Sequence, residues 1–339
     1  SDAEVLKAFK KYSTNKYITA PDEHIRLLVA TCLCDLMLKI PADDYEKVKL
    51  TAKGVFVECI FLLCVDCIRM GVTKSKEVLD RVMYLLVQLS NPFFYQTLLP
   101  MCGKADSITL QLLDNCRYLC INHPRDKVPD KIGTVLASYF STTNVGPCGD
   151  LVKKIVSYMG QIDTDKNFSH MVLIANFGST SGAFDRGFAT HFNKMLFARH
   201  TDDGAAIDML DEKHLGLRSV VALIYHKNQQ ISARILPNLH DDLVDIDPNL
   251  RAVTAEIVVH LMGENPDFAK HYPTLFTQYK ARLSDVNATV RLRCVDCLHS
   301  FLGTIPREYV QELVTLLTPR LSDSDDDVRK ASSVVSKPS

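Results

Sequence analysis

The chain has 339 residues, of which 47% are hydrophobic and 23% are charged, a composition typical of a folded rather than a disordered protein. This length suffices for two compact domains or for one continuous array of repeats. The 39 Lys and Arg residues nearly balance the 40 Asp and Glu residues, so the net charge of −1 argues against a dedicated, sequence-specific nucleic-acid-binding protein.

The first predicted element is a charged, amphipathic helix in residues 1–13. It lacks the apolar stretch of a secretory signal, so we expect the 11 cysteines of the chain to be reduced thiols in the cytosol or nucleus. Lysines and tyrosines form a basic and aromatic strip here, which we interpret as a solvated helix face rather than a phosphate site. The strip consists of Lys7, Lys10, Lys11, Tyr12, Lys16 and Tyr17.

A second helix is predicted to begin after Asp22 and to end before Pro41. An aspartate ahead of a helix accepts hydrogen bonds from the first free N–H groups and suits the positive end of the helix dipole. An arginine one turn later, here Arg26, can reach a carboxylate of the preceding repeat or the carbonyls of the loop.

The most hydrophobic run, Val55–Ile68, contains Glu58 and Asp66 and is shorter than the roughly 20 residues that a membrane span needs. We therefore predict a buried helix at Val55–Ile68 and no membrane association. Most later segments also place apolar residues at the helical spacing i, i+3, i+4 and i+7, as in Leu79–Leu86 and Val310–Leu317.

We predict three regions: N-terminal HEAT-like helices in residues 1–140, an irregular and partly helical connection in 141–215, and C-terminal HEAT repeats in 216–339. The last repeat is expected to be truncated. Within the connection, the predicted irregular segments are 141–149, 175–187 and 199–213, with a short helix at 191–197.

The C-terminal region repeats itself with a period near 40 residues. Arg251, Arg291 and Arg329 are 40 and 38 residues apart, and each follows an acidic residue at a helix start. Two helices per 40-residue unit are typical of HEAT repeats, in which neighbouring helix pairs bury each other's apolar faces. The predicted fold is therefore all-α, a HEAT-repeat α-solenoid of stacked antiparallel helix pairs. The predicted structural repeat residues are Arg26, Asp247, Arg251, Asp285, Arg291, Asp325 and Arg329.

The acidic run Asp323–Asp327 is predicted to be a helix cap followed by a solvated loop. The remaining candidate chemistry lies in the cysteines, at 32 and 34, 64 and 67, and 294 and 297. A zinc site needs four convergent ligands, usually from turns, whereas these pairs lie within apolar helices. We interpret them as small core side chains and predict no metal.

The sequence contains no phosphate-binding loop and no zinc-protease, hydrolase or kinase motif. We therefore predict a protein that is not an enzyme and has no cofactor. A metal or thiol enzyme built on the cysteines is an alternative that stoichiometric zinc in the purified protein would favour.

Three segments resemble, in the same order, the Pds cohesion-regulator family, which comprises the fifth Pds protein and its relatives. Arg26–Asp35 and the Ile-Pro-Ala-Asp-Asp-Tyr sequence after it are similar to the family's first HEAT units and their A-P-D-A-P-Y element. Ile235–Val253 and Ala269–Leu292 are similar to two later repeat units. Since members of the family are far longer than 339 residues, the resemblance implies an N-terminal part or a reduced relative.

The resemblance implies a nuclear, chromatin-associated scaffold that regulates sister-chromatid cohesion. The implied partners are the cohesin kleisin subunit, the SMC proteins and a Wapl-type release factor. The residues implied to bind a partner are Pro41, Ala42, Asp43, Asp44 and Tyr45, with Asp44 in place of the family's second proline. A generic HEAT adaptor for transport, phosphatase or coat assembly is an alternative that the repeat pattern fits equally well.

Overall fold

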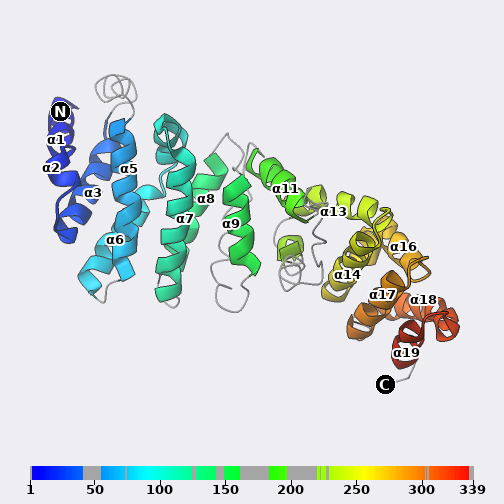
Figure 1. Ribbon diagram of the computed structural model, residues 1–339. Coiled ribbons are helices and arrows are strands. Elements are labelled where there is room, and N and C mark those ends of the chain that lie inside the picture. Colours follow the sequence, from blue (N-terminus) through cyan, green and yellow to red (C-terminus); the bar gives the residue numbers. More distant parts are fainter. Residues whose placement is uncertain are drawn as a thin grey trace. The chain divides into compact units, whose positions relative to one another are not determined.

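The structure of the chain is a computed structural model (Figure 1). It describes residues 2–40, 55–72, 75–123, 127–142, 149–160, 183–196, 220–226 without 222, and 229–335 without 302 and 304. Within these ranges all regular elements are helices, as the sequence predicts, and no helix is long and apolar enough to cross a membrane. The chain divides into two compact units, residues 1–191 and 192–339.

Among its described residues, the first unit contains eight α-helices, three short helical turns and the start of α11. The α-helices are α1 (Asp2–Tyr12), α2 (Asn15–Ile18), α3 (Glu23–Met37), α5 (Val55–Ile68), α6 (Lys76–Leu89), α7 (Ala105–Asn122), α8 (Val128–Thr142), α9 (Gly149–Gly160) and α11 (Ala183–Leu196), which ends in the second unit. The short turns are η1 (Arg69–Val72), η2 (Phe94–Leu98) and η3 (Leu99–Met101).

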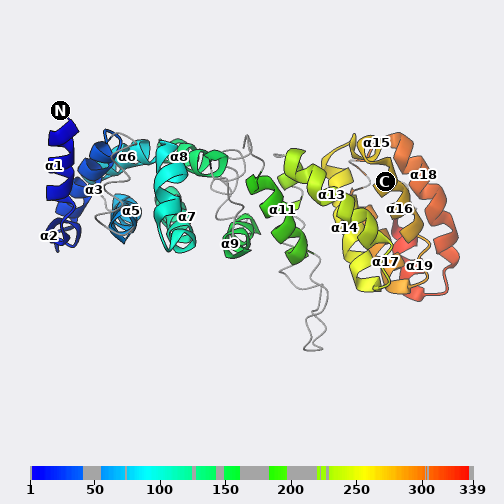
Figure 2. The same cartoon turned by 90° about the horizontal axis from the view of Figure 1, so that it is seen from above.

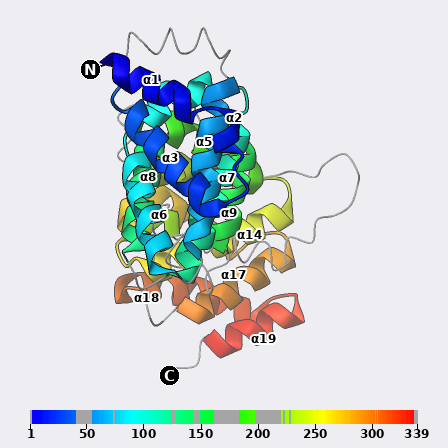
Figure 3. The ribbon, with the colours of Figure 1, turned by 90° about the vertical axis from the view of Figure 1, so that its left-hand side faces the viewer.

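The helices of the first unit pack in two rows. Helices α3, α6 and α8 contact one another in sequence, and so do α5, α7 and α9 (Figures 2 and 3). The core lies between the rows, where side chains such as Leu27, Leu86 and Leu112 are buried. The predicted buried helix Val55–Ile68 is confirmed as α5 with the same bounds.

Among its described residues, the second unit contains seven further α-helices after α11. They are α13 (Gln229–Leu243), α14 (Pro248–Glu264), α15 (Phe268–His271), α16 (Pro273–Arg282), α17 (Ala288–Phe301), α18 (Arg307–Leu317) and α19 (Asp326–Val335), with the short turn η4 (Thr318–Ser322) after α18. Helices α14, α17 and α19 pack side by side in one row, and α13 packs against α16 in the other. Apolar residues of both rows, such as Leu239, Val258 and Leu298, form the buried core.

The centre of the chain is more helical than predicted. The helix predicted at 191–197 begins at Ala183, inside a segment predicted to be irregular. Its apolar face explains the earlier start, because Phe184, Phe188 and Phe192 recur every four residues and are all buried. Residues 175–182 of the segment predicted at 175–187, the whole segment 199–213, and residues 143–148 lie outside the described residues. The three-part division into 1–140, 141–215 and 216–339 stays a prediction.

Candidate interaction surface

Four arginines fix the loops that precede their own helices. In each case the guanidinium Nη1 donates a hydrogen bond of 2.6–2.8 Å to the backbone carbonyl six residues upstream. The donors are Arg26, Arg251, Arg291 and Arg329, and the acceptors are Ala20, Asp245, Asp285 and Asp323. A loop tied down in this way loses little further conformational entropy when a partner binds to it.

A side chain four residues before each arginine caps the helix. Its oxygen accepts a hydrogen bond of 2.8–3.0 Å from the backbone N–H two residues later. The capping residues are Asp22, Asp247, Asn287 and Asp325. The assignment of Asp285 as the acidic residue at the start of its helix is therefore corrected, because Asn287 caps α17 and Asp285 lies two residues earlier.

The carboxylates of Asp285 and Asp323 connect consecutive repeats. Asp285 accepts two hydrogen bonds from Arg251, and Asp323 accepts two from Arg291. Arg282 contacts Asp285 at 2.8 Å, and an arginine three residues before Asp323 does the same in the next repeat. The partner carboxylate thus belongs to the following repeat, whereas the sequence suggested the preceding one. Asp323 is a buried ion-pair residue and not part of a solvated loop.

These ion pairs hold both carboxylates in the charged form. Burial alone raises the pKa of Asp285, but hydrogen bonds from Arg251 and from the Asn287 backbone N–H outweigh it and lower the pKa below its usual value. The Arg291 hydrogen bonds lower the pKa of Asp323 to about 2. Both pairs therefore persist at physiological pH.

The fixed loops present apolar side chains to solvent. Ile246 and Val286 occupy the same position in successive repeats and are 95% and 94% exposed. Each side chain lies next to a backbone carbonyl that an arginine holds. The repeat geometry thus displays two exposed apolar residues on ordered loops of the second unit.

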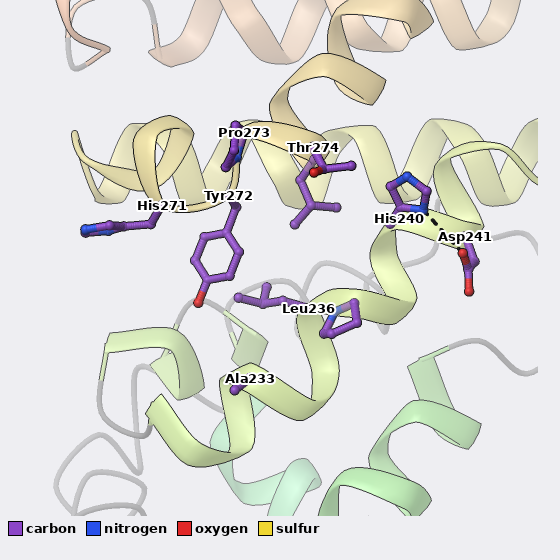
Figure 4. Close-up of a pocket in the computed structure, with 10 residues that line it drawn as sticks. Ala233, Leu236, His240, Asp241, His271, Tyr272, Pro273 and Thr274 are labelled. Atoms are coloured by element: carbon purple, nitrogen blue, oxygen red, sulfur yellow. Dashed lines mark hydrogen bonds and ion pairs between the residues drawn. The ribbon is translucent and has the colours of Figure 1, made fainter.

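A groove lies between α13 and the junction of α15 with α16 in the second unit (Figure 4). Its volume is about 560 Å³, within the range of small ligand and side-chain pockets. It is lined by Ala233, Leu236, Pro237, His240, Asp241, His271, Tyr272, Pro273, Thr274 and Leu275.

The aromatic wall of the groove is the ring of Tyr272. This ring lies 5.1 Å from the ring of Phe268 and 6.1 Å from that of Tyr225, and these two rings are 5.5 Å apart. Edge-to-face and tilted ring contacts at such distances are favourable, so the orientation of Tyr272 is fixed by its neighbours. Burial raises the pKa of the Tyr272 hydroxyl, which therefore stays protonated at neutral pH.

The opposite end of the groove is polar. The His240 Nδ1 lies 3.3 Å from the Asp241 Oδ1, and Figure 4 shows this pair beyond the side chain of Leu236. The side chain of Asp241 is 85% exposed. Among the ten described lining residues there is no Lys or Arg, so Asp241 gives the groove a negative end.

The N-terminal docking residues predicted from sequence, Pro41 to Tyr45, lie outside the described residues. The helix before them is linked to its neighbour, because the Tyr84 hydroxyl donates to the Asp35 carboxylate at 2.8 and 2.9 Å. Ile25 and Leu28 on α3 are each 44% exposed. The exposed face of the first half of α3 is therefore partly apolar.

The basic and aromatic strip at the N-terminus carries local cation–π contacts. Lys11 lies 5.4 Å from the Tyr12 ring, Lys16 lies 5.8 Å from the Tyr17 ring, and the two rings are 5.7 Å apart. All four lysines of the strip are exposed. These contacts agree with a solvated helix face.

The cysteine pairs are largely core residues. Cys34 and Cys64 are fully buried, with their sulfur atoms 3.3 Å apart, and Cys294 and Cys297 are also buried. The prediction for Cys32 is wrong: it is exposed, because two residues along a helix turn a side chain by about 200°. No cluster of three potential metal ligands occurs among the described residues.

Sequence reasoning missed the loop residue Asp245, the ion-pair role of Asp323, and the whole groove. For the aspartates a signal was present, since an acidic residue precedes each C-terminal repeat arginine by six positions. For the groove, the only local signals were Pro237 within a helix and Pro273 at a helix start.

The comparisons with known proteins agree on one family. The family model described as "Sister chromatid cohesion protein PDS5 protein" matches residues 4–336. The chain is similar to Sister chromatid cohesion protein pds5 of Schizosaccharomyces pombe, with 21% identity over 184 residues, covering 53% of this chain and 15% of the relative. It is also similar to Sister chromatid cohesion protein PDS5 homolog B-A of Xenopus laevis, with 21% identity over 315 residues, covering 92% of this chain and 21% of the relative.

The fold also matches a solved structure, that of the Pds5–Scc1 complex. The TM-score is 0.76 at 15% identity, and the match covers 99% of this chain and 51% of the other. This likeness shows the predicted helical-repeat fold. The chain thus spans about a fifth or less of the length of the curated relatives and about half of the solved chain.

Proposed function

Because the chain belongs to the sister chromatid cohesion protein PDS5 family, we propose that it is a non-catalytic HEAT-repeat scaffold that binds the cohesin ring and regulates sister-chromatid cohesion. The proposed main partner is the kleisin subunit. The observation that carries this proposal is the match along 99% of the chain to the fold of a Pds5 protein in complex with Scc1.

The physical design of the chain supports a binding scaffold. Stacked helix pairs offer extended surfaces to peptides and partner domains rather than one deep cavity. The Arg251–Asp285 and Arg291–Asp323 pairs hold successive loops in place, and the loops carry the exposed Ile246 and Val286. Ordered loops with exposed apolar side chains suit protein binding better than catalysis.

The finer partner assignments are also proposals. SMC proteins and a Wapl-type release factor would bind as further cohesin partners, in the nucleus and on chromatin. The segment Pro41–Tyr45 follows α3 and would supply a proline, two carboxylates and one aromatic ring to such a partner.

Affinity purification of the tagged chain from a nuclear extract at mild salt, followed by mass spectrometry, tests the proposal. We expect the kleisin and SMC subunits among the captured proteins, and loss of one partner when Asp43 and Tyr45 are both changed to Ala. A matched control changes the exposed Asp80 and Tyr118 to Ala. Recovery of no cohesin subunit would overturn the proposal, and equal loss from both double variants would overturn the role of Asp43 and Tyr45.

A further inference from the structure

The groove between α13 and α16 is built as a second docking surface, formed by different residues from the Pro41–Tyr45 segment. We propose that it binds an extended segment of a partner protein that places an apolar side chain between Tyr272 and Leu236 and a lysine or arginine on Asp241. This proposal concerns the chemistry of the bound segment and does not depend on which protein carries it.

The apolar part of the groove is preformed. Leu236 and Leu275 at its base are 1% and 4% exposed, so core packing fixes their positions. The ring of Tyr272 is held by Phe268 and Tyr225. An aromatic wall beside fixed aliphatic groups can accept an apolar side chain without rearrangement, which lowers the entropic cost of binding.

The walls favour recognition through side chains rather than through the backbone. Both walls of the groove are helices, and Pro237 and Pro273 have no N–H to donate. A bound segment therefore cannot extend a sheet here, as it does in strand addition. A segment that is already extended in solution loses least entropy on entering such a groove.

The negative charge of Asp241 favours a basic residue in the bound segment. Asp241 is the carboxylate at its end, is largely exposed and faces solvent beside His240. None of the ten described lining residues is Lys or Arg, and Asp241 is the one carboxylate among them. A basic side chain that pairs with Asp241 complements the charge of this carboxylate.

The test uses random 12-residue peptides displayed on phage and selected on the full chain. We expect enriched peptides with Lys or Arg within about four residues of an apolar residue, the reach of an extended chain across the groove. Fluorescence anisotropy then measures the affinity of the labelled peptides for the wild-type chain and for the groove variants Tyr272→Ala and Asp241→Lys. The matched control is Asp80→Lys, which makes the same charge change at an exposed site on α6.

We expect Tyr272→Ala to raise Kd at least tenfold, as loss of an aromatic anchor does. Asp241→Lys should raise Kd about threefold to fivefold, because exposed ion pairs contribute little, and changing the basic residue of the peptide to Glu should restore binding to this variant. Asp80→Lys should bind as the wild type does.

Circular dichroism checks that each variant is folded. Because Asp241 is exposed, the charge exchange between Asp241→Lys and the Glu-substituted peptide still tests the proposal if Tyr272→Ala unfolds. Enrichment of acidic peptides, of no peptide, or only of peptides insensitive to both groove variants would overturn the proposal.

Discussion

The guanidinium of Arg251 binds the carboxylate of Asp285 through two hydrogen bonds, 2.9 Å from Nε to Oδ2 and 2.8 Å from Nη2 to Oδ1. The two side chains are only 8% and 1% exposed. Arg251 lies in the first turn of α14, and Asp285 lies in the loop before α17, so the pair joins one repeat to the next. The same pair recurs between Arg291 and Asp323, which explains why the arginines are spaced by one repeat.

Asp285→Ala is expected to lower the free energy of unfolding by about 3 kcal/mol, because it leaves the Arg251 guanidinium buried without its counter-charge. Urea denaturation followed by circular dichroism measures the change. Asp326→Ala is the control: Asp326 pairs with Arg329 at 2.7 Å, but its side chain is 63% exposed, so we expect a much smaller loss than from Asp285→Ala. Equal losses from the two variants would contradict a structural role for the buried pair.

The stability of the second unit is expected to depend on pH through Asp323. Hydrogen bonds from Arg291 lower its pKa to about 2 in the folded chain, against about 3.9 for an unfolded aspartate. A lowered folded pKa stabilises the fold above about pH 4, and this contribution is lost as the pH falls toward 2. The difference in urea midpoint between wild type and Asp323→Asn should therefore be constant from pH 7 to 5 and shrink steadily as the pH falls from 4 through 2. A difference that does not change with pH would exclude this linkage.

Replacing Gly71 by alanine and replacing Gly133 by alanine should change the stability of the first unit in opposite directions. A Cβ on Gly71 would lie 2.9 Å from the Leu119 Cδ1 and 3.1 Å from the Val82 Cγ1, so Gly71→Ala should destabilise the first unit by about 1–3 kcal/mol. Gly133 lies inside α8 with no atom within 4 Å of an added Cβ, so Gly133→Ala should stabilise by about 0.5–1 kcal/mol. Thermal unfolding of both variants checks the signs, and a stabilising Gly71→Ala would show that α7 packs differently.

The rate at which each cysteine is labelled should be lower the more deeply its thiol is buried. Under native conditions, Cys32 and Cys59 should react with maleimide before Cys34 and Cys64, which are buried. Partial burial and the nearby Asp35 raise the pKa of Cys32, so its reaction rate should rise at a higher pH than that of a free thiol. Peptide mapping by mass spectrometry after short labelling times identifies the sites. Fast labelling of Cys64 would contradict the packing of α3 on α5.

The sequence predicts the features that depend on neighbouring residues. The all-α fold and the bounds of α5 follow from apolar spacing along one helix, and the repeat follows from the capping residue and arginine at each helix start. Asp22 and Asp247 show this directly, because each caps a helix whose arginine lies four residues later.

Contacts between repeats and between helices could not be predicted in the same way. Asp323 resembles a solvated acidic residue in the sequence, and only the stacking of α17 on α19 brings Arg291 to it. The groove joins Leu236 to Tyr272, 36 positions apart, and depends on the turn between α15 and α16. Cys32 was misassigned because an apolar helix does not show by itself which side faces solvent.

The most direct test of the central proposal is gel filtration of the purified chain mixed with a purified cohesin complex that contains the kleisin and SMC subunits. At micromolar concentration and mild salt, we predict that the chain elutes with the complex and that omission of the kleisin abolishes this co-elution. Separate elution of the chain and the complete complex under these conditions would contradict a cohesin-binding scaffold.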